Sequence, residues 1–124
     1  MSAPSPMGNQ DPIKILRDKL RQFAAERDWD QFHSPKNLAM ALSVEAAELL
    51  EHFQWLSDAE SAALASKKRA NIREELADVL LYLIRLADKL DIDLATAAAD
   101  KLSVNARKYP VQKARGSSEK YTEL

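Results

Sequence analysis

The sequence has no cysteine, and it has only two histidines and two glycines in 124 residues. Without cysteine, the chain has neither disulfides nor thiolate metal ligands nor a cysteine nucleophile. So few glycines argue against a β fold with many tight turns. The formal net charge of −1 gives no general reason to bind nucleic acid or anionic lipid. These absences favour a helical protein whose metal ligands, if it has any, are oxygen atoms.

The sequence gives no reason to expect a secretory leader or a membrane-spanning helix. The N-terminal stretch MSAPSPMGNQDP has no basic segment leading into an apolar run, and no later segment approaches the roughly 18 uninterrupted apolar residues of a membrane span. With 46% hydrophobic and 30% charged residues, the chain suits a single soluble domain in the cytoplasm. We expect a flexible segment over residues 1–10, a folded domain over 11–110 and a tail over 111–124.

Apolar residues that recur every three or four positions predict four helices. Asp11 before Pro12 and Ser34 before Pro35 are residue pairs typical of a helix N-cap and first helical position. Pro110 is expected to end the last helix. The expected helices cover about 12–28, 35–54, 66–90 and 93–108, with LSDAES at 56–61 as a break. The fold class is therefore expected to be all-α, a compact domain resembling a four-helix bundle.

Two acidic residues of the second expected helix do not lie on its polar side. Leu38, Leu42 and Leu49 define the apolar stripe of this helix. At about 100° per residue, Glu45 lies within about 40° to 60° of these leucines, and Glu48 lies on the border of the stripe. Both carboxylates are therefore expected to face inward.

The third expected helix repeats this arrangement. Its apolar stripe consists of Ile72, Leu76, Val79, Leu83 and Leu90. Glu75, Asp78 and Tyr82 run along one edge of the stripe, within roughly 60° of one another. Leu81 and Ile84 lie off the stripe, and together with Leu56 they predict contacts with a neighbouring subunit.

Carboxylates gathered inside a helical domain require compensation, because burial of each charge is costly and like charges repel. A hard divalent cation bound by four oxygen ligands, Mg²⁺ or Mn²⁺, is the simplest solution. Mg²⁺ commonly bridges carboxylates to substrate phosphates. Lys101 and Asn105, four residues apart on the fourth expected helix, lie on its apolar side, and Lys101 could neutralise phosphate oxygens that the metal leaves uncovered.

Other interpretations of the same residues remain open at this point. The acidic pairs could decorate solvated helix edges, and the aromatic residues could pack at helix ends. A di-iron bundle would need Glu-x-x-His pairs on its helices, whereas Glu48 and His52 are four residues apart. A helical interaction module without catalysis would also explain the apolar faces.

Three motifs in order resemble those of the MazG-type nucleoside triphosphate pyrophosphohydrolases. They are SVEAAEL, EELADVLLYL and KLSVNARKYP. The likeness is greatest to the dCTP-hydrolysing members, and it extends to the segments FAAERDWDQFHSPKNL, EHFQWLSD and KYTEL. It thus covers about residues 20–124.

This resemblance implies Mg²⁺-dependent hydrolysis of a deoxynucleoside triphosphate, dCTP or a modified dCTP, to the monophosphate and pyrophosphate. It implies a helical oligomer whose sites combine residues of neighbouring subunits, and we expect a homotetramer built from dimers. Glu45, Glu48, Glu75 and Asp78 correspond to metal ligands and catalytic residues. The implied substrate-binding residues are Trp29, His33, Trp55, Tyr82, Lys101, Asn105, Lys108 and Tyr109.

Overall fold

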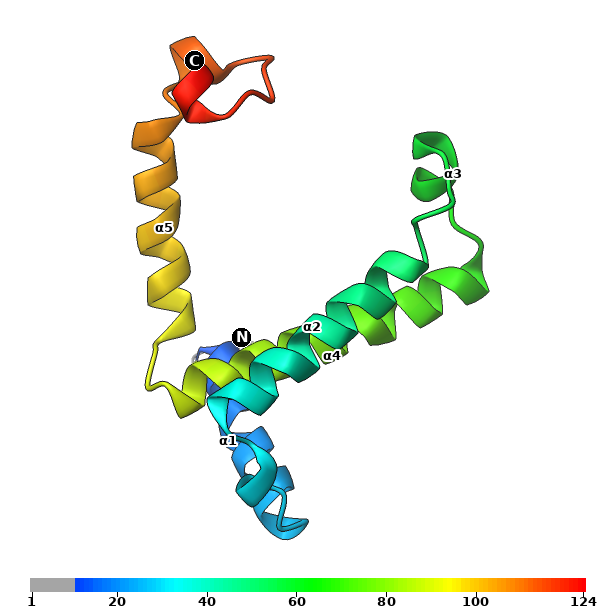
Figure 1. Ribbon diagram of the computed structural model, residues 1–124, viewed down its shortest axis with the longest axis vertical. Coiled ribbons are helices and arrows are strands. Elements are labelled where there is room, and N and C mark those ends of the chain that lie inside the picture. The colour runs from blue at the N-terminus through cyan, green and yellow to red at the C-terminus, as the bar shows by residue number, and fades with distance from the viewer. Residues whose placement is uncertain (1–10) are drawn as a thin grey trace, which may run out of the picture. The chain divides into compact units, whose positions relative to one another are not determined.

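The computed structural model describes residues 11–124, so the expected flexible segment over 1–10 lies outside the described residues. The described residues form α-helices and short 3₁₀-helices without a strand, which confirms the all-α class (Figure 1). The elements are α1 (Pro12–Glu26), η1 (Asp30–Phe32), α2 (Pro35–Glu51), α3 (Asp58–Ala62), α4 (Ser66–Lys89), α5 (Leu94–Lys108), α6 (Val111–Ala114) and η2 (Tyr121–Glu123). None of these helices combines the length and apolar character that a membrane crossing needs.

The starts of α1 and α2 confirm the two predicted capping residues. The Asp11 side chain accepts a hydrogen bond from the Ile13 amide at 2.9 Å, and Pro12 is the first residue of α1. The Ser34 hydroxyl accepts one from the Asn37 amide at 3.1 Å at the start of α2. Each cap satisfies an amide that the first turn of a helix leaves without a partner.

Two short helices were not predicted. α3 overlaps the expected break, and Ser57 and Glu60 form a reciprocal capping box at its start. α6 lies in the expected tail, directly after Pro110. Four or five residues are too few for a periodic apolar face, and so neither helix has the sequence pattern of a long one.

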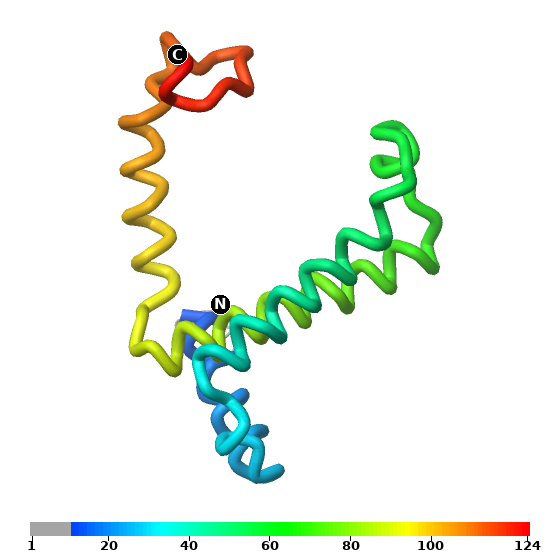
Figure 2. Tube along the Cα trace, in the orientation of Figure 1, coloured from blue at the N-terminus to red at the C-terminus, as the bar shows by residue number. Residues whose placement is uncertain are grey.

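The chain divides into two units, one ending at Asp91 and the other covering Ile92–Leu124. In the first unit, α2 and α4 run side by side in opposite directions (Figures 1 and 2). α1 also packs against α4, and Arg21 of α1 forms a bidentate ion pair with Asp88 of α4. The second unit contains α5, α6 and η2.

The buried side of α4 differs from the predicted stripe. Ile72 is buried as expected, but Leu76 and Leu90 are 54% and 49% exposed. Ile84, predicted to contact another subunit, is buried within the chain instead. Because α4 packs against both α1 and α2, its inward surface is wider than a single helical stripe, and the prediction for Ile84 was wrong.

Candidate active site

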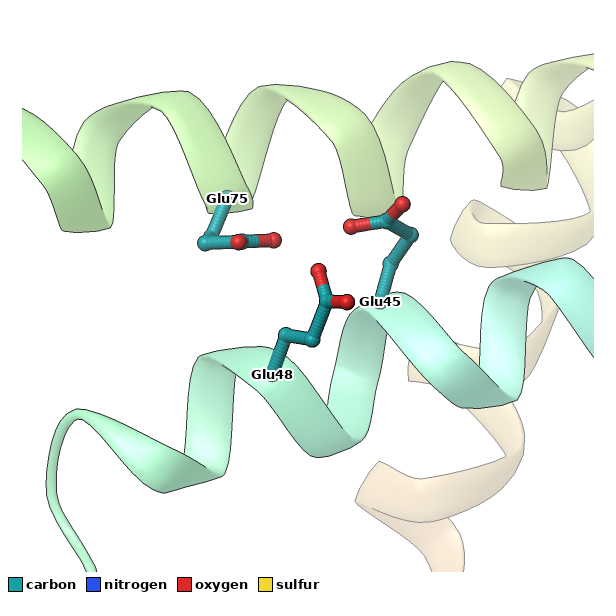
Figure 3. A group of neighbouring side chains, drawn as sticks. All are labelled: Glu45, Glu48 and Glu75. Atoms are coloured by element: carbon teal, nitrogen blue, oxygen red, sulfur yellow. The ribbon is translucent and has the colours of Figure 1, made fainter.

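Three carboxylates from two helices meet between α2 and α4. Glu45 and Glu48 project from α2, and Glu75 projects from α4 toward them (Figure 3). One carboxylate oxygen of each lies within 4.8 Å of the others. All three side chains are partly buried. The prediction that these three carboxylates face the neighbouring helix is therefore confirmed.

The electrostatics of this group are unfavourable without a cation. One oxygen of Glu45 and one of Glu75 are buried and have no hydrogen-bond partner among the described residues. The hydrogen bond that a protonated Glu45 can donate to Glu75, partial burial and the neighbouring Glu48 together raise the pKa of Glu45 from 4.5 to about 7. Buried oxygens without partners are the groups that a hard divalent cation would satisfy, so the residues present fit such an ion.

A pocket of about 230 Å³ lies in the same unit, and Asp78, from the acidic motif of α4, is one of its lining residues. Its walls are Leu20, Phe23, Ala24, Trp29, His33, Asp78, Leu81, Tyr82 and Arg85. Asp78 follows Glu75 by three residues, so the pocket and the carboxylate group lie about one helical turn apart along α4. Pockets for drug-sized ligands measure roughly 300–1,000 Å³, so this smaller pocket suits a single ring system.

The end of α1 positions Trp29 in this pocket. Asp28 adopts a left-handed conformation with φ 54°, and the amides of Asp28 and Trp29 bond to the carbonyls of Ala25 and Ala24. This is a Schellman motif, which reverses the chain directly after the helix. The Trp29 ring then meets the Phe23 ring edge-on, with centroids 5.6 Å apart.

His33 and Arg85 form the polar side of the pocket. The Arg85 Nε–H donates to His33 Nδ1 at 3.1 Å, and another guanidinium nitrogen donates to Asp30 at 2.6 Å. Partial burial, followed by the positive charges of Arg85 and Lys89, lowers the pKa of His33. This shift favours the neutral form of the His33 imidazole.

The structure gathers the predicted residues into separate groups. Glu45, Glu48 and Glu75 form the carboxylate group, whereas Asp78 joins Trp29, His33 and Tyr82 as a lining residue of the pocket. Trp55, after the end of α2, is 86% exposed and does not line this pocket.

The remaining predicted residues belong to the second unit. Lys101 and Asn105 lie on α5, which begins at an N-cap by Asp93. Lys108, at the end of α5, holds its ammonium 4.9 Å from the centre of the Tyr121 ring. Tyr109 meets the same ring edge-on at 6.0 Å. Tyr121 thus contacts both Lys108, the last residue of α5, and Tyr109, which follows it.

Sequence reasoning missed Arg85. It lies in the segment YLIRLAD, three residues after Tyr82, and only 7% of its side chain is exposed. The available signal was a charged residue inside an apolar run, because an arginine is rarely so buried without specific partners.

Several known proteins are similar to this chain over most of its length. The model of the MazG-like family matches residues 40–124. dCTP pyrophosphatase 1 from Rattus norvegicus is 46% identical over 99% of this chain and 74% of its own length. The same enzyme from Homo sapiens is 50% identical over 90% of this chain and 67% of its own length. A pyrophosphatase structure from Archaeoglobus fulgidus superposes with a TM-score of 0.77 at 42% identity, covering 82% of this chain and 95% of the other.

The fold and the paired carboxylates on neighbouring helices place the chain in an all-α class of proteins with an acidic site between helices. The chain belongs to the MazG-like family.

Proposed function

We propose that this chain is a nucleoside triphosphate pyrophosphohydrolase that converts dCTP, or a dCTP with a modified base, to the monophosphate and pyrophosphate. The observation that carries the proposal is the group of Glu45, Glu48 and Glu75, with its buried oxygens without partners, one helical turn from an aromatic pocket. The relatives named dCTP pyrophosphatase 1 support the choice of substrate.

The same carboxylates would hold a divalent cation, Mg²⁺ or Mn²⁺, with Asp78 as the fourth ligand. Oxygen atoms are the ligands that these ions prefer, and the group offers neither sulfur nor nitrogen. When bound, the ion supplies Lewis acidity that offsets negative charge on the phosphoryl oxygens. A carboxylate oxygen that is free of the ion can accept the proton of the attacking water.

The pocket would hold the base. Trp29 offers an apolar face for stacking, while His33 and Tyr82 offer polar groups to the base edge or sugar. Lys101, Asn105, Lys108 and Tyr109 would contact phosphate or sugar. Lysine acts there as a point charge on the phosphate rather than as a bidentate clamp.

We further propose that the active protein is a homotetramer built from dimers. Many large apolar side chains of the first unit are exposed on a single chain, including Val44, Leu50 and Leu76. Monomeric proteins rarely expose apolar surface of this extent, whereas interfaces between subunits cover it. Trp55, with 86% of its surface exposed, would then contact the nucleotide bound by a neighbouring subunit.

A nucleotide panel tests the function. Purified protein is incubated with each canonical dNTP and with 5-methyl-dCTP, with Mg²⁺ or with excess EDTA, and both products are quantified. We expect pyrophosphate and monophosphate in equal amounts, fastest from a cytosine nucleotide and only with the cation. Binding of nucleotide without pyrophosphate release would contradict the proposal and favour a non-catalytic helical module.

A further inference from the structure

Arg85 is a buried cation whose contacts exceed what charge balance requires. Its guanidinium bonds to Asp30 at 2.6 Å and lies 3.6 Å from Asp88. Both acids also have another cation, since Lys89 pairs with Asp30 and Arg21 pairs with Asp88. Unlike Lys89 and Arg21, which pair with these acids, Arg85 also donates a hydrogen bond from Nε to His33 Nδ1 at 3.1 Å. This bond connects α4 to the residue that follows η1.

The direction of this hydrogen bond determines where His33 carries its proton. An arginine Nε–H can only donate, and so Nδ1 of His33 must be the acceptor and carry no proton. A neutral imidazole then has its proton on Nε2. The remaining polar atom of the His33 ring is therefore a hydrogen-bond donor and cannot act as an acceptor.

The surrounding charges keep the ring in this state. Partial burial, and then the positive charges of Arg85 and Lys89 of α4, lower the pKa of His33, and Asp30 of η1 opposes them with a smaller effect. A doubly protonated ring would also turn Nδ1–H toward the Arg85 donor, which would break the bond. His33 lines the 230 Å³ pocket together with Arg85.

We propose that Arg85 is a positioning residue that holds His33 as the Nε2–H tautomer, so that the pocket selects a base with an acceptor at its edge. Cytosine offers its unprotonated N3 and its O2 as acceptors, whereas thymine carries a proton on N3. A fixed donor therefore favours cytosine over thymine at the ring position where the two differ. This inference rests on the proposed function, because it requires that the base bind in this pocket.

The first test reads the tautomer directly, without activity. Two-bond ¹H–¹⁵N spectra distinguish protonated from unprotonated ring nitrogens, and His52→Gln assigns the signals because the chain has two histidines. We expect His33 in the wild type to be protonated on Nε2 and unprotonated on Nδ1. Arg85→Met should lose this preference and show a mixture of tautomers. A wild-type His33 protonated on Nδ1 would overturn the proposal.

Lys89→Met is the matched control. Lys89 pairs with the same Asp30 carboxylate as Arg85, but over residues 11–124 the hydrogen bond to His33 comes from Arg85 and not from Lys89. Its loss should therefore leave the tautomer unchanged. Arg85→Met should fold, because Asp30 and Asp88 each keep another cation. If it does not, Arg85→Lys keeps the charge without the guanidinium fork, and the same loss of preference is expected.

The second test is selectivity. The ratio of kcat/KM for dCTP to that for dTTP should fall roughly five- to tenfold in Arg85→Met, which corresponds to the loss of one hydrogen bond. In Lys89→Met this ratio should stay at the wild-type value. Equal losses for both nucleotides in both variants would indicate a merely structural role and overturn the proposal. A wild type with the expected tautomer and no activity toward any dNTP would contradict the proposed function instead, and the tautomer measurement would still stand.

Discussion

Glu45 is the residue whose charge is least compatible with its surroundings in the absence of a cation. Glu75 from α4 and Glu48 from α2 face it, and its pKa rises from 4.5 to about 7. The folded state therefore binds more protons than the unfolded state between these two values. The stability that this proton contributes is fully present below about pH 4.5 and is lost as the pH rises through about 7.

This shift predicts a pH-dependent stability of the metal-free protein. In EDTA, the melting temperature of the wild type should fall from pH 5 to pH 8, and Glu45→Gln should make the fall shallower because the amide does not titrate. Glu51→Gln, on the same helix but exposed and outside the carboxylate group, should keep the wild-type slope. Thermal melts at a series of pH values measure this. An unchanged slope in Glu45→Gln would contradict the assignment.

Trp29 gives a second prediction at the level of single residues. If its ring stacks on the base, Trp29→Ala should weaken dCTP binding by about 1–3 kcal/mol, because a base–aromatic stack is lost. The effect should appear mainly in KM, while the response to Mg²⁺ stays intact. Phe32→Ala is the control, since Phe32 is exposed and does not line the pocket. Unchanged kinetics in a folded Trp29→Ala would assign Trp29 to packing alone.

Among the elements, the α2–α4 pair holds the carboxylate group in place. Leu38 of α2 is almost fully buried, and it is part of the core of the unit in which α2 packs against α4. Leu38→Ala should lower the free energy of unfolding by about 2–5 kcal/mol through lost burial and a residual cavity. Met40→Ala, at an exposed position of the same helix, should change it by much less. Denaturant titration measures both, and equal effects would contradict the packing described.

The long helices could be predicted because their signals are local. Pro12, Pro35 and the residues before them mark two helix starts, and each acidic pair lies within one helix. The short α3 and α6 escaped prediction because four or five residues cannot display a helical period.

The candidate site was predictable only to the extent that helical spacing determines it. Glu45 and Glu48 had to share a face, and their meeting with Glu75 follows once α2 packs on α4. The bond between Arg85 and His33 joins residues 52 positions apart, so it depends on how α1, η1 and α4 pack. The burial of Ile84 could not be predicted for the same reason, because it depends on two helices contacting α4.

At the scale of the whole molecule, the exposed apolar side chains predict an assembly. Size-exclusion chromatography with light scattering at micromolar concentration should give four times the 13.9 kDa mass of one chain. Leu50→Arg and Leu76→Arg, at exposed apolar positions of α2 and α4, should shift the population toward smaller species. A wild-type monomer at this concentration would contradict the predicted tetramer.

The most direct test of the central claim is the melting temperature with and without Mg²⁺. A ligand at about one hundred times its Kd adds about 2.7 kcal/mol of stability, so the wild type should melt higher with the cation. Glu48→Gln removes a charge at nearly constant volume, so it should lose most of this gain and be more stable than the wild type without metal. Glu51→Gln should respond as the wild type does. If Glu48→Gln shows the same Mg²⁺-dependent rise as the wild type, the carboxylate group is not a metal site and the account is wrong.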